Sequence, residues 1–250
     1  MFVGRTAMRL WGLPHPDVWT GAEPLHVCVA PDAAPPRGAG VKGRRLAPHR
    51  TRRLIFGGAA VVDPIAAVLS SAADLTLIQM VTAFDALLTD ADNYPGMLAV
   101  RPLATPEEVQ RRLAEWGRFP GCATVRTALG LARRGVESPK ESETRLMIRA
   151  GGLPEPVVQW EVFDGARLVA RVDLAYPELK IAIEYDGDGH RSDREQWRRD
   201  IRRQRELERR GWIVIRLTQA DLDDPDAFLT HLRHARRARL ASGMRARPRV

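Results

Sequence analysis

Apolar and polar positions alternate through the second half of the chain in a way that predicts strands. Three successive strands are expected, over Val157 to Phe163, Arg167 to Tyr176 and Lys180 to Asp186. Asp164-Gly165 is typical of a hairpin turn between the first two, and Pro177-Glu178 is a turn signal between the second two. The pattern therefore predicts a three-stranded meander.

Segments whose apolar residues have helical spacing precede and follow this meander. A helix is expected over Ser142 to Ala150, a long arginine-rich one over Ser192 to Arg210, and a last one over Asp226 to Leu240. Trp212 to Leu217 is a continuous apolar run of strand length. Because this strand follows the meander through a long helix, it should lie parallel to one of the meander strands. The prediction is an α/β fold with the order α-β-β-β-α-β and a mixed sheet.

The first half is expected to be a mostly helical scaffold with a small sheet. Leu25 to Ala30 and Leu54 to Val62 are strand-like, and the Pro/Gly-rich stretch Pro31 to Gly43 between them should be a loop. Helices are predicted over Ile65 to Ser71, Thr76 to Leu88, Thr105 to Trp116 and Thr124 to Arg134. We expect domains over 1–136 and 137–241, followed by a basic disordered tail, 242–250.

Composition limits the class of protein. With 44% hydrophobic and 28% charged residues, the chain falls in the globular range. Cys28 and Cys122 are the only cysteines, so a disulfide framework and a zinc finger are both disfavoured. The sequence shows neither a signal peptide nor an apolar run of about 20 residues. A soluble, cytoplasmic protein without a small-molecule cofactor is expected.

The net charge of +8 suggests a polyanionic partner. However, only Lys42, Lys140 and Lys180 among the 39 basic residues are lysines. An arginine skew of this kind, with abundant Ala, Gly and Pro, is also what a GC-rich genome produces whatever the function. The charge therefore supports a nucleic-acid partner without establishing one.

Carboxylates gather on one face of the predicted second hairpin. Side chains alternate along a strand, which places Asp173 on one face of its strand and Glu184 and Asp186 together on the next. A turn centred on Pro177-Glu178 would pair Asp173 with Ala182, one step from Glu184. Three carboxylates in one patch repel unless a cation neutralises them, and oxygen ligands suit Mg²⁺, Mn²⁺ or Ca²⁺. The alternative is a set of solvated acids on a half-exposed sheet.

Two neighbouring features favour the metal site. A glycine-rich bend delivers His190 to the carboxylate edge, where histidine can accept a proton from water or ligate the metal. The following helix carries a stripe of arginines suited to gripping phosphates, and Trp197, Ile201 and Gln204 are expected to face the sheet. The stripe consists of Arg194, Arg198, Arg202, Arg205 and Arg209. A solvated charged face is the alternative for this stripe.

In combination these motifs resemble the very-short-patch-repair-like (Vsr-like) endonuclease domains of the PD-(D/E)XK superfamily. The matching positions are Val172-Asp173-Leu174, Ile183-Glu184-Tyr185-Asp186-Gly187 with His190, Asp200 and Arg203, Leu207, Gly211-Trp212, Val214 and Arg216. The resemblance covers about 110 residues and implies a restriction-endonuclease-like core. It implies that Asp173 and Glu184 hold the metal, that His190 is a base or supporting residue, and that Glu143 or Glu141 faces the site. Asp186 stands where the superfamily usually has a lysine.

The first half resembles, more weakly, the scaffold of actinobacterial proteins akin to AbiEi-type antitoxins. Gly4-Arg5-Thr6-Ala7 and Leu10-Trp11-Gly12-Leu13-Pro14 carry this resemblance. In such relatives a winged-helix segment precedes this stretch, and we expect that segment to be missing here, either truly or through a misassigned start codon.

Three hypotheses of function follow. The first is a Mg²⁺- or Mn²⁺-dependent DNA endonuclease or nickase, with Asp173, Glu184, Asp186, His190 and Glu143 as its catalytic residues. The first three of these would be the metal ligands, and Arg194, Arg198, Arg202 and Arg205 would bind DNA. The second is a non-catalytic DNA-binding or antitoxin-like regulator, and the third is a protein-interaction module. The sequence leaves open whether the nucleic acid is DNA or RNA. It also leaves open whether the protein forms a homodimer or binds a toxin–antitoxin partner.

Overall fold

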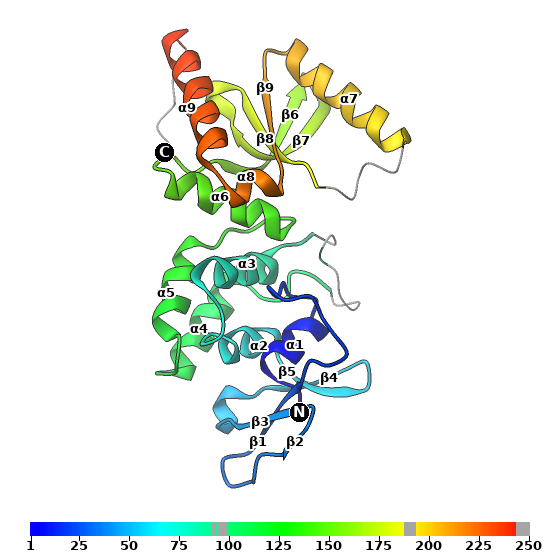
Figure 1. Ribbon diagram of the computed structural model, residues 1–250, viewed down its shortest axis with the longest axis vertical. Coiled ribbons are helices and arrows are strands. Elements are labelled where there is room, and N and C mark those ends of the chain that lie inside the picture. The colour runs from blue at the N-terminus through cyan, green and yellow to red at the C-terminus, as the bar shows by residue number, and fades with distance from the viewer. Residues whose placement is uncertain (92–93, 95–99, 188–193, 244–250) are drawn as a thin grey trace. The chain divides into compact units, whose positions relative to one another are not determined.

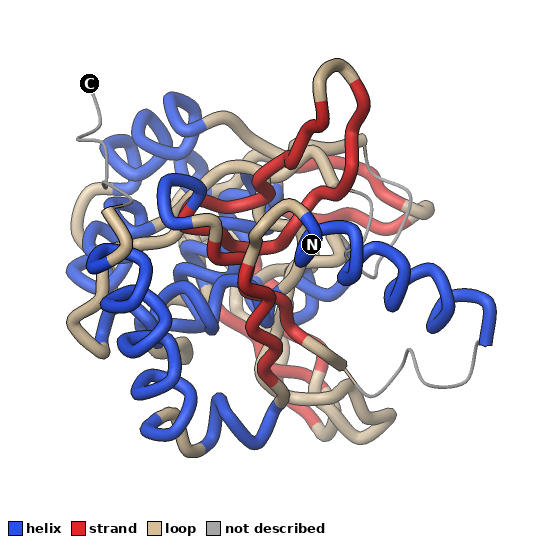
Figure 2. Tube along the Cα trace, turned by 90° about the horizontal axis from the view of Figure 1, so that it is seen from above, coloured by secondary structure: helices blue, strands red, loops and turns tan. Residues whose placement is uncertain are grey.

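The computed structural model describes residues 1–91, 94, 100–187 and 194–243, except for the side chains of 194–197. The chain divides into two compact units, Met1–Pro139 (the N-terminal unit) and Lys140–Val250 (the C-terminal unit). Helices and strands both contribute to the chain (Figure 2), and the sheet of the C-terminal unit is mixed, which confirms the predicted α/β class. In the described ranges no helix is long and apolar enough to cross a membrane.

The strands of the N-terminal unit are β1 (Leu25–Val29), β2 (Arg37–Gly38), β3 (Val41–Arg45), β4 (Arg53–Phe56) and β5 (Ala59–Val62). β3 pairs in parallel with β1 and antiparallel with β2, while β4 and β5 form a hairpin. The predicted loop Pro31 to Gly43 was wrong, because it contains β2 and the start of β3. The single strand predicted over Leu54 to Val62 was also wrong. The chain reverses there at Gly57-Gly58, whose positive φ angles of 56° and 79° suit a tight hairpin turn.

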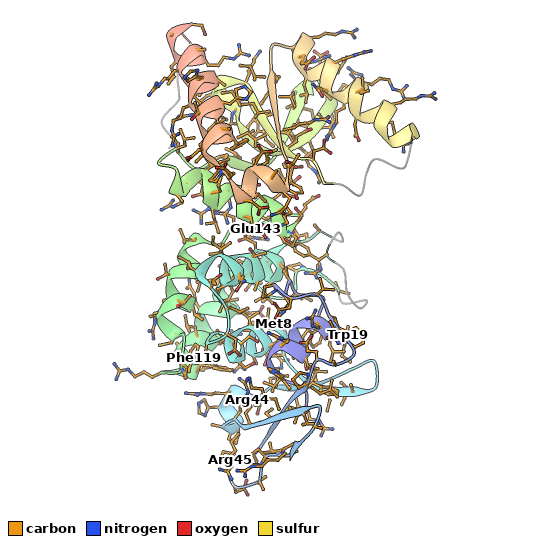
Figure 3. All side chains as sticks on the ribbon, in the orientation of Figure 1. Met8, Trp19, Arg44, Arg45, Phe119 and Glu143 are labelled. Carbon is orange, nitrogen blue, oxygen red and sulfur yellow. The ribbon has the colours of Figure 1, made fainter. Side chains whose placement is uncertain are left out.

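The helices of the N-terminal unit are α1 (Gly4–Leu10), the 3-10 helix η1 (Pro48–Arg50), α2 (Pro64–Ser70), α3 (Leu77–Leu88), α4 (Pro106–Trp116) and α5 (Cys122–Leu131). Asp63 caps α2, since its carboxylate accepts a hydrogen bond from Ala66 N at 3.1 Å. Thr76 and Thr105 begin α3 and α4 through capping boxes. Met8 of α1, labelled in Figure 3, is fully buried in this unit.

The C-terminal unit contains α6 (Pro139–Ala150), β6 (Val157–Asp164), β7 (Arg167–Tyr176), the 3-10 helix η2 (Pro177–Leu179), β8 (Ile181–Tyr185), α7 (Arg194–Arg209), β9 (Ile213–Leu217), α8 (Gln219–Asp223) and α9 (Asp226–Ala241). The sheet order is β6-β7-β8-β9. β6, β7 and β8 form the predicted antiparallel meander, and β9 pairs in parallel with β8. The crossover through α7 therefore produces the mixed sheet expected from the sequence.

Helices cover both faces of this sheet (Figure 1). On one face a first core joins α6 and α9 to the sheet through apolar residues such as Ile148, Ile183 and Leu232. A second core contains Ala175, Ala182 and Leu207 of α7, which lies on the opposite face. Removal of this apolar surface from water holds α7 against β7 and β9. The central strands are thus buried on both faces, and a polar side chain on them must find partners within the fold.

Candidate metal and nucleic-acid site

Asp173 and Glu184 meet across adjacent strands of the C-terminal sheet. The β7–β8 ladder pairs Ala175 with Ala182 and ends at Leu174 and Ile183, so Asp173 falls opposite Glu184. The predicted pairing of Asp173 with Ala182 was wrong by two residues. The reason is the turn, because η2 and the left-handed residue Lys180 add length between the strands. The observed register brings the two carboxylates closer than the sequence predicted.

The Asp173 carboxylate also binds a backbone N–H of β8 at the point where the β7–β8 ladder ends. Its Oδ2 accepts a hydrogen bond from Tyr185 N at 3.1 Å, which fixes the carboxylate against β8. On the other side of β8, Asp186 N donates to Leu217 O at 2.8 Å, so pairing with β9 continues past this point. β7 and β8 thus part at the level of the two acids while β8 and β9 stay together.

Glu184 is a buried carboxylate with an incompletely satisfied oxygen. Its exposed fraction is 6%, and burial, the largest effect, raises its pKa. The guanidinium of Arg203 opposes this rise and the nearby Asp173 adds to it. Arg203 Nη2 lies 3.0 Å from Glu184 Oε1, yet this oxygen accepts no aligned hydrogen bond from any described residue. The contact is therefore an ion pair that leaves coordinating capacity on Oε1.

Asp186 lies at the edge of this centre. Arg216, which faces Glu184 on β9, is 3.9 Å from Glu184 Oε2 and 3.9 Å from Asp186 Oδ2. Within residues 1–91, 94, 100–187 and 194–243, no three His, Cys, Asp or Glu side chains are grouped so as to hold a metal ion. The structure thus brings Asp173 and Glu184 together and places Asp186 beside an arginine. It does not show the three-carboxylate cage expected from the sequence.

Of the two acids of the first helix that were expected to face the site, Glu141 is buried and Glu143 is partly exposed. Glu141 is 6% exposed and accepts a hydrogen bond from Gln159 Nε2 at 2.9 Å. Gln159 falls opposite Asp173 in the register of β6 and β7, so this contact links α6 to the level of the site. Glu143, labelled in Figure 3, is partly exposed and pairs with Lys140 at 2.6 Å. The two acids differ in burial because residues two apart in an α-helix point to nearly opposite sides of it.

The remaining predicted residues are described only in part. His190 lies outside the described residues, and so does the side chain of Arg194. Arg198, Arg202 and Arg205 are exposed along α7, as a phosphate-binding stripe requires. Ile201 and Gln204, which were expected to face the sheet, are partly buried, while Leu207 is the α7 residue buried in the second core.

Sequence reasoning assigned no role to Arg203 and Arg216. Arg203 joins two strands, since it pairs with Glu184 and donates to Arg171 O at 3.2 Å. The signal that could have found it is its spacing, because Arg203 lies four residues before Leu207 and so on the sheet-facing side of α7. Arg216 could have been found by extending the parallel pairing of β8 and β9.

The donor set fits a divalent cation held by two carboxylates. Asp173 and Glu184 offer hard oxygen ligands, and the buried Oε1 of Glu184 has coordinating capacity left. Mg²⁺ commonly binds proteins through one or two carboxylates and keeps several of its waters, so a third protein ligand is not required. Arg203 and Arg216 add positive charge beside this pair, which suits a phosphate next to the metal.

Comparison with protein families matches one family to part of the C-terminal unit. Residues 163–235 match the family model REase_MTES_1575, which describes a restriction-endonuclease-like family. The matched segment includes Asp173, Glu184 and the whole of α7. No solved structure matches significantly.

Two proteins of Mycobacterium tuberculosis are similar to about half of the chain. They are "Uncharacterized protein MT2308" of strain CDC 1551 / Oshkosh and "Uncharacterized protein Rv2248" of strain ATCC 25618 / H37Rv. Each is 30% identical over 136 residues, which cover 54% of this chain and 50% of the relative. The chain thus spans about half the length of the curated relatives it matches. The family match and the sheet topology together support a restriction-endonuclease-like domain in the C-terminal unit.

Proposed function

We propose that the protein is a metal-dependent DNA endonuclease or nickase of the Vsr-like kind, with Mg²⁺ or Mn²⁺ held by Asp173 and Glu184. The observation that carries the proposal is the pair itself. Two carboxylates face each other across β7 and β8, and one of them is buried with an unsatisfied oxygen. A buried carboxylate that keeps a raised pKa costs stability, so its retention on a central strand is better explained by function than by folding.

The chain's own residues would divide the work as follows. Asp173 and Glu184 would bind the ion, and Tyr185 N would hold Asp173 in place through the 3.1 Å hydrogen bond. When bound, the ion would supply an activated water and charge stabilisation at the phosphate. Arg203 and Arg216 would bind the phosphate under attack, because both guanidinium groups already lie at the carboxylate pair. Asp186, at the usual lysine position, would tether Arg216.

The exposed arginines of α7 would hold the DNA backbone. Arg198, Arg202 and Arg205 lie three or four residues apart and so share the exposed side of α7, whereas Arg203 lies on its sheet-facing side. Contacts from such a stripe position the duplex without reading its sequence. Arg203, which pairs with Glu184 from the sheet-facing side of the same helix, would then contact a phosphate at the metal.

A second candidate function is DNA binding without catalysis. Arg203 and Arg216 both contact Glu184, so the fold can balance this charge through its own arginines. This charge balance favours a regulator that keeps the nuclease fold and the arginine stripe.

Nicking of supercoiled plasmid separates the two functions. The parent protein should convert supercoiled to open-circular DNA in Mg²⁺ or Mn²⁺ and not in EDTA. Asp173→Asn should lower the rate at least about 100-fold, since loss of a direct ligand should cost no less than loss of a supporting residue. Asp224→Asn, at an exposed acid after α8, is the matched control and should nick like the parent.

Equal nicking by Asp173→Asn and the parent would show that the assigned site is wrong. Salt-sensitive DNA binding in EDTA, with no cleavage in any metal, would support the regulator instead.

A further inference from the structure

Gln159 has a backbone conformation that its strand does not require. Its φ is +47°, in the left-handed region that L side chains rarely adopt. Lys180, with φ +49°, is the other described non-glycine residue with positive φ. Lys180 belongs to the turn between η2 and β8, where such a conformation reverses the chain. Gln159 lies inside β6, where an extended residue would pair normally, so its strain needs another explanation.

The strained residue lies level with the carboxylate pair. Val158 pairs with Leu174 and Trp160 pairs with Val172, so Gln159 falls opposite Asp173. Asp173 in turn falls opposite Glu184, and Glu184 pairs with Arg216. The four strands therefore contribute Gln159, Asp173, Glu184 and Arg216 to one row across the sheet. The strain occurs in the row that carries the candidate site.

The side chain of Gln159 uses this conformation to reach a buried acid. Gln159 Nε2 donates to Glu141 Oε2 at 2.9 Å, and Glu141 is 6% exposed. Glu141 lies on α6, while Gln159 lies on β6. The hydrogen bond thus ties a third carboxylate to the row of Asp173 and Glu184.

We propose that Gln159 is a positioning residue whose strained backbone holds the amide on Glu141. Through that contact Glu141 orients a water of the metal site. The role is indirect, because the described acids form no group of three that could ligate one ion. This inference rests on the proposed function, since it assumes that Asp173 and Glu184 bind a divalent cation.

A purely structural role for the strain makes a different prediction. Val158 packs against the first core and Val162 belongs to the second, although both are even-numbered positions of β6. Leu174 and Val172 differ in the same way on β7. The left-handed conformation of Gln159 could serve only to shift the side chains of β6 from the first core to the second. In that case any residue that tolerates positive φ would replace glutamine without loss of function.

Two substitutions at Gln159 and one control separate these roles in the 250-residue chain. Gln159→Gly removes both the strain and the amide. Gln159→Asn keeps an amide and tolerates positive φ, but it is one methylene too short to reach Glu141. Lys180→Gly relieves a comparable φ in the turn and is the matched control. The readouts are Mn²⁺ binding by calorimetry without DNA, thermal unfolding and plasmid nicking.

The positioning role predicts that both Gln159 variants bind Mn²⁺ about tenfold more weakly and nick about tenfold more slowly, as loss of supporting contacts at metal sites does. Both should remain folded, and Lys180→Gly should match the parent in binding and nicking. If Gln159→Asn or Gln159→Gly binds and nicks like a parent that binds Mn²⁺, this inference alone fails. If the parent binds no Mn²⁺, the proposed function fails and the inference fails with it.

Discussion

Asp63 and Asp85 of the N-terminal unit and Glu184 of the C-terminal unit are buried acids with opposite surroundings. In the N-terminal unit Asp63 accepts a hydrogen bond from Ala66 N and pairs with Arg112 at 3.0 Å. Asp85, fully buried in α3, accepts from Arg133 N at 2.6 Å. Asp63 therefore caps the start of α2, and Asp85 accepts a hydrogen bond from the backbone just after α5. In the C-terminal unit Glu184 is as deeply buried as Asp63, yet its Oε1 lacks an aligned donor among the described residues and burial raises its pKa.

This difference shows why burial of an acid does not by itself indicate a functional site. An acid that satisfies nearby backbone donors contributes to stability. An acid that remains incompletely satisfied costs stability, and its presence requires another explanation. The comparison therefore predicts opposite effects of neutral substitutions at Asp63 and Glu184.

The largest expected effect on stability is at Asp63. Asp63→Ala should lower the free energy of unfolding by about 2–4 kcal/mol, because it removes a helix cap and leaves Arg112 without this partner. Chemical denaturation followed by circular dichroism measures this loss. Asp63→Asn keeps the capping oxygen and should lose less. A change below about 0.5 kcal/mol in Asp63→Ala would contradict the structural role.

A smaller effect of opposite sign is expected at Glu184. Its pKa is higher in the folded chain than its ordinary value of 4.5, so the folded state binds more protons just above that pH. Stability is therefore lost as the pH rises through this window, and at neutral pH the charged group is a cost. Glu184→Gln should unfold at a higher temperature than the parent near pH 7.5, and the difference should shrink as the pH falls toward 4.5.

Glu161→Gln, at an exposed acid of β6, is the control and should leave the unfolding temperature unchanged at both pH values. The same Glu184→Gln protein should lose nicking if the site assignment is right. A Glu184→Gln protein that is less stable than the parent at neutral pH would place Glu184 with Asp63 among the structural acids.

The elements of the C-terminal unit could be predicted well because their apolar residues follow regular strand and helix spacings. The strands, the crossover helix and the parallel β9 follow from alternation and length, which depend on local residue order. The register of Asp173 and Glu184 did not follow, because η2 and the left-handed Lys180 lengthen the turn beyond what Pro177-Glu178 indicates. Local patterns specify elements better than they specify the path between them.

The N-terminal sheet was harder to predict for a related reason. β2 has two residues and lies in a Pro/Gly-rich stretch, so no alternation could identify it. Phe2 forms bridges to Val27 and to Val61, contacts that link distant parts of the chain. The contacts of Arg203 and Gln159 were not predicted for the same reason. Their partners, Glu184 and Glu141, lie on other elements that are distant in sequence.

Mn²⁺ soaked into crystals of the 250-residue chain would test whether Asp173 and Glu184 bind a divalent cation. Anomalous scattering should show a manganese peak in contact with one oxygen of each carboxylate, at the roughly 2 Å typical of such small divalent ions. Arg203 should no longer contact Glu184 Oε1 when the ion is bound. No peak between the two carboxylates at saturating Mn²⁺, with Arg203 still paired to Glu184, would show that this pair does not bind the ion.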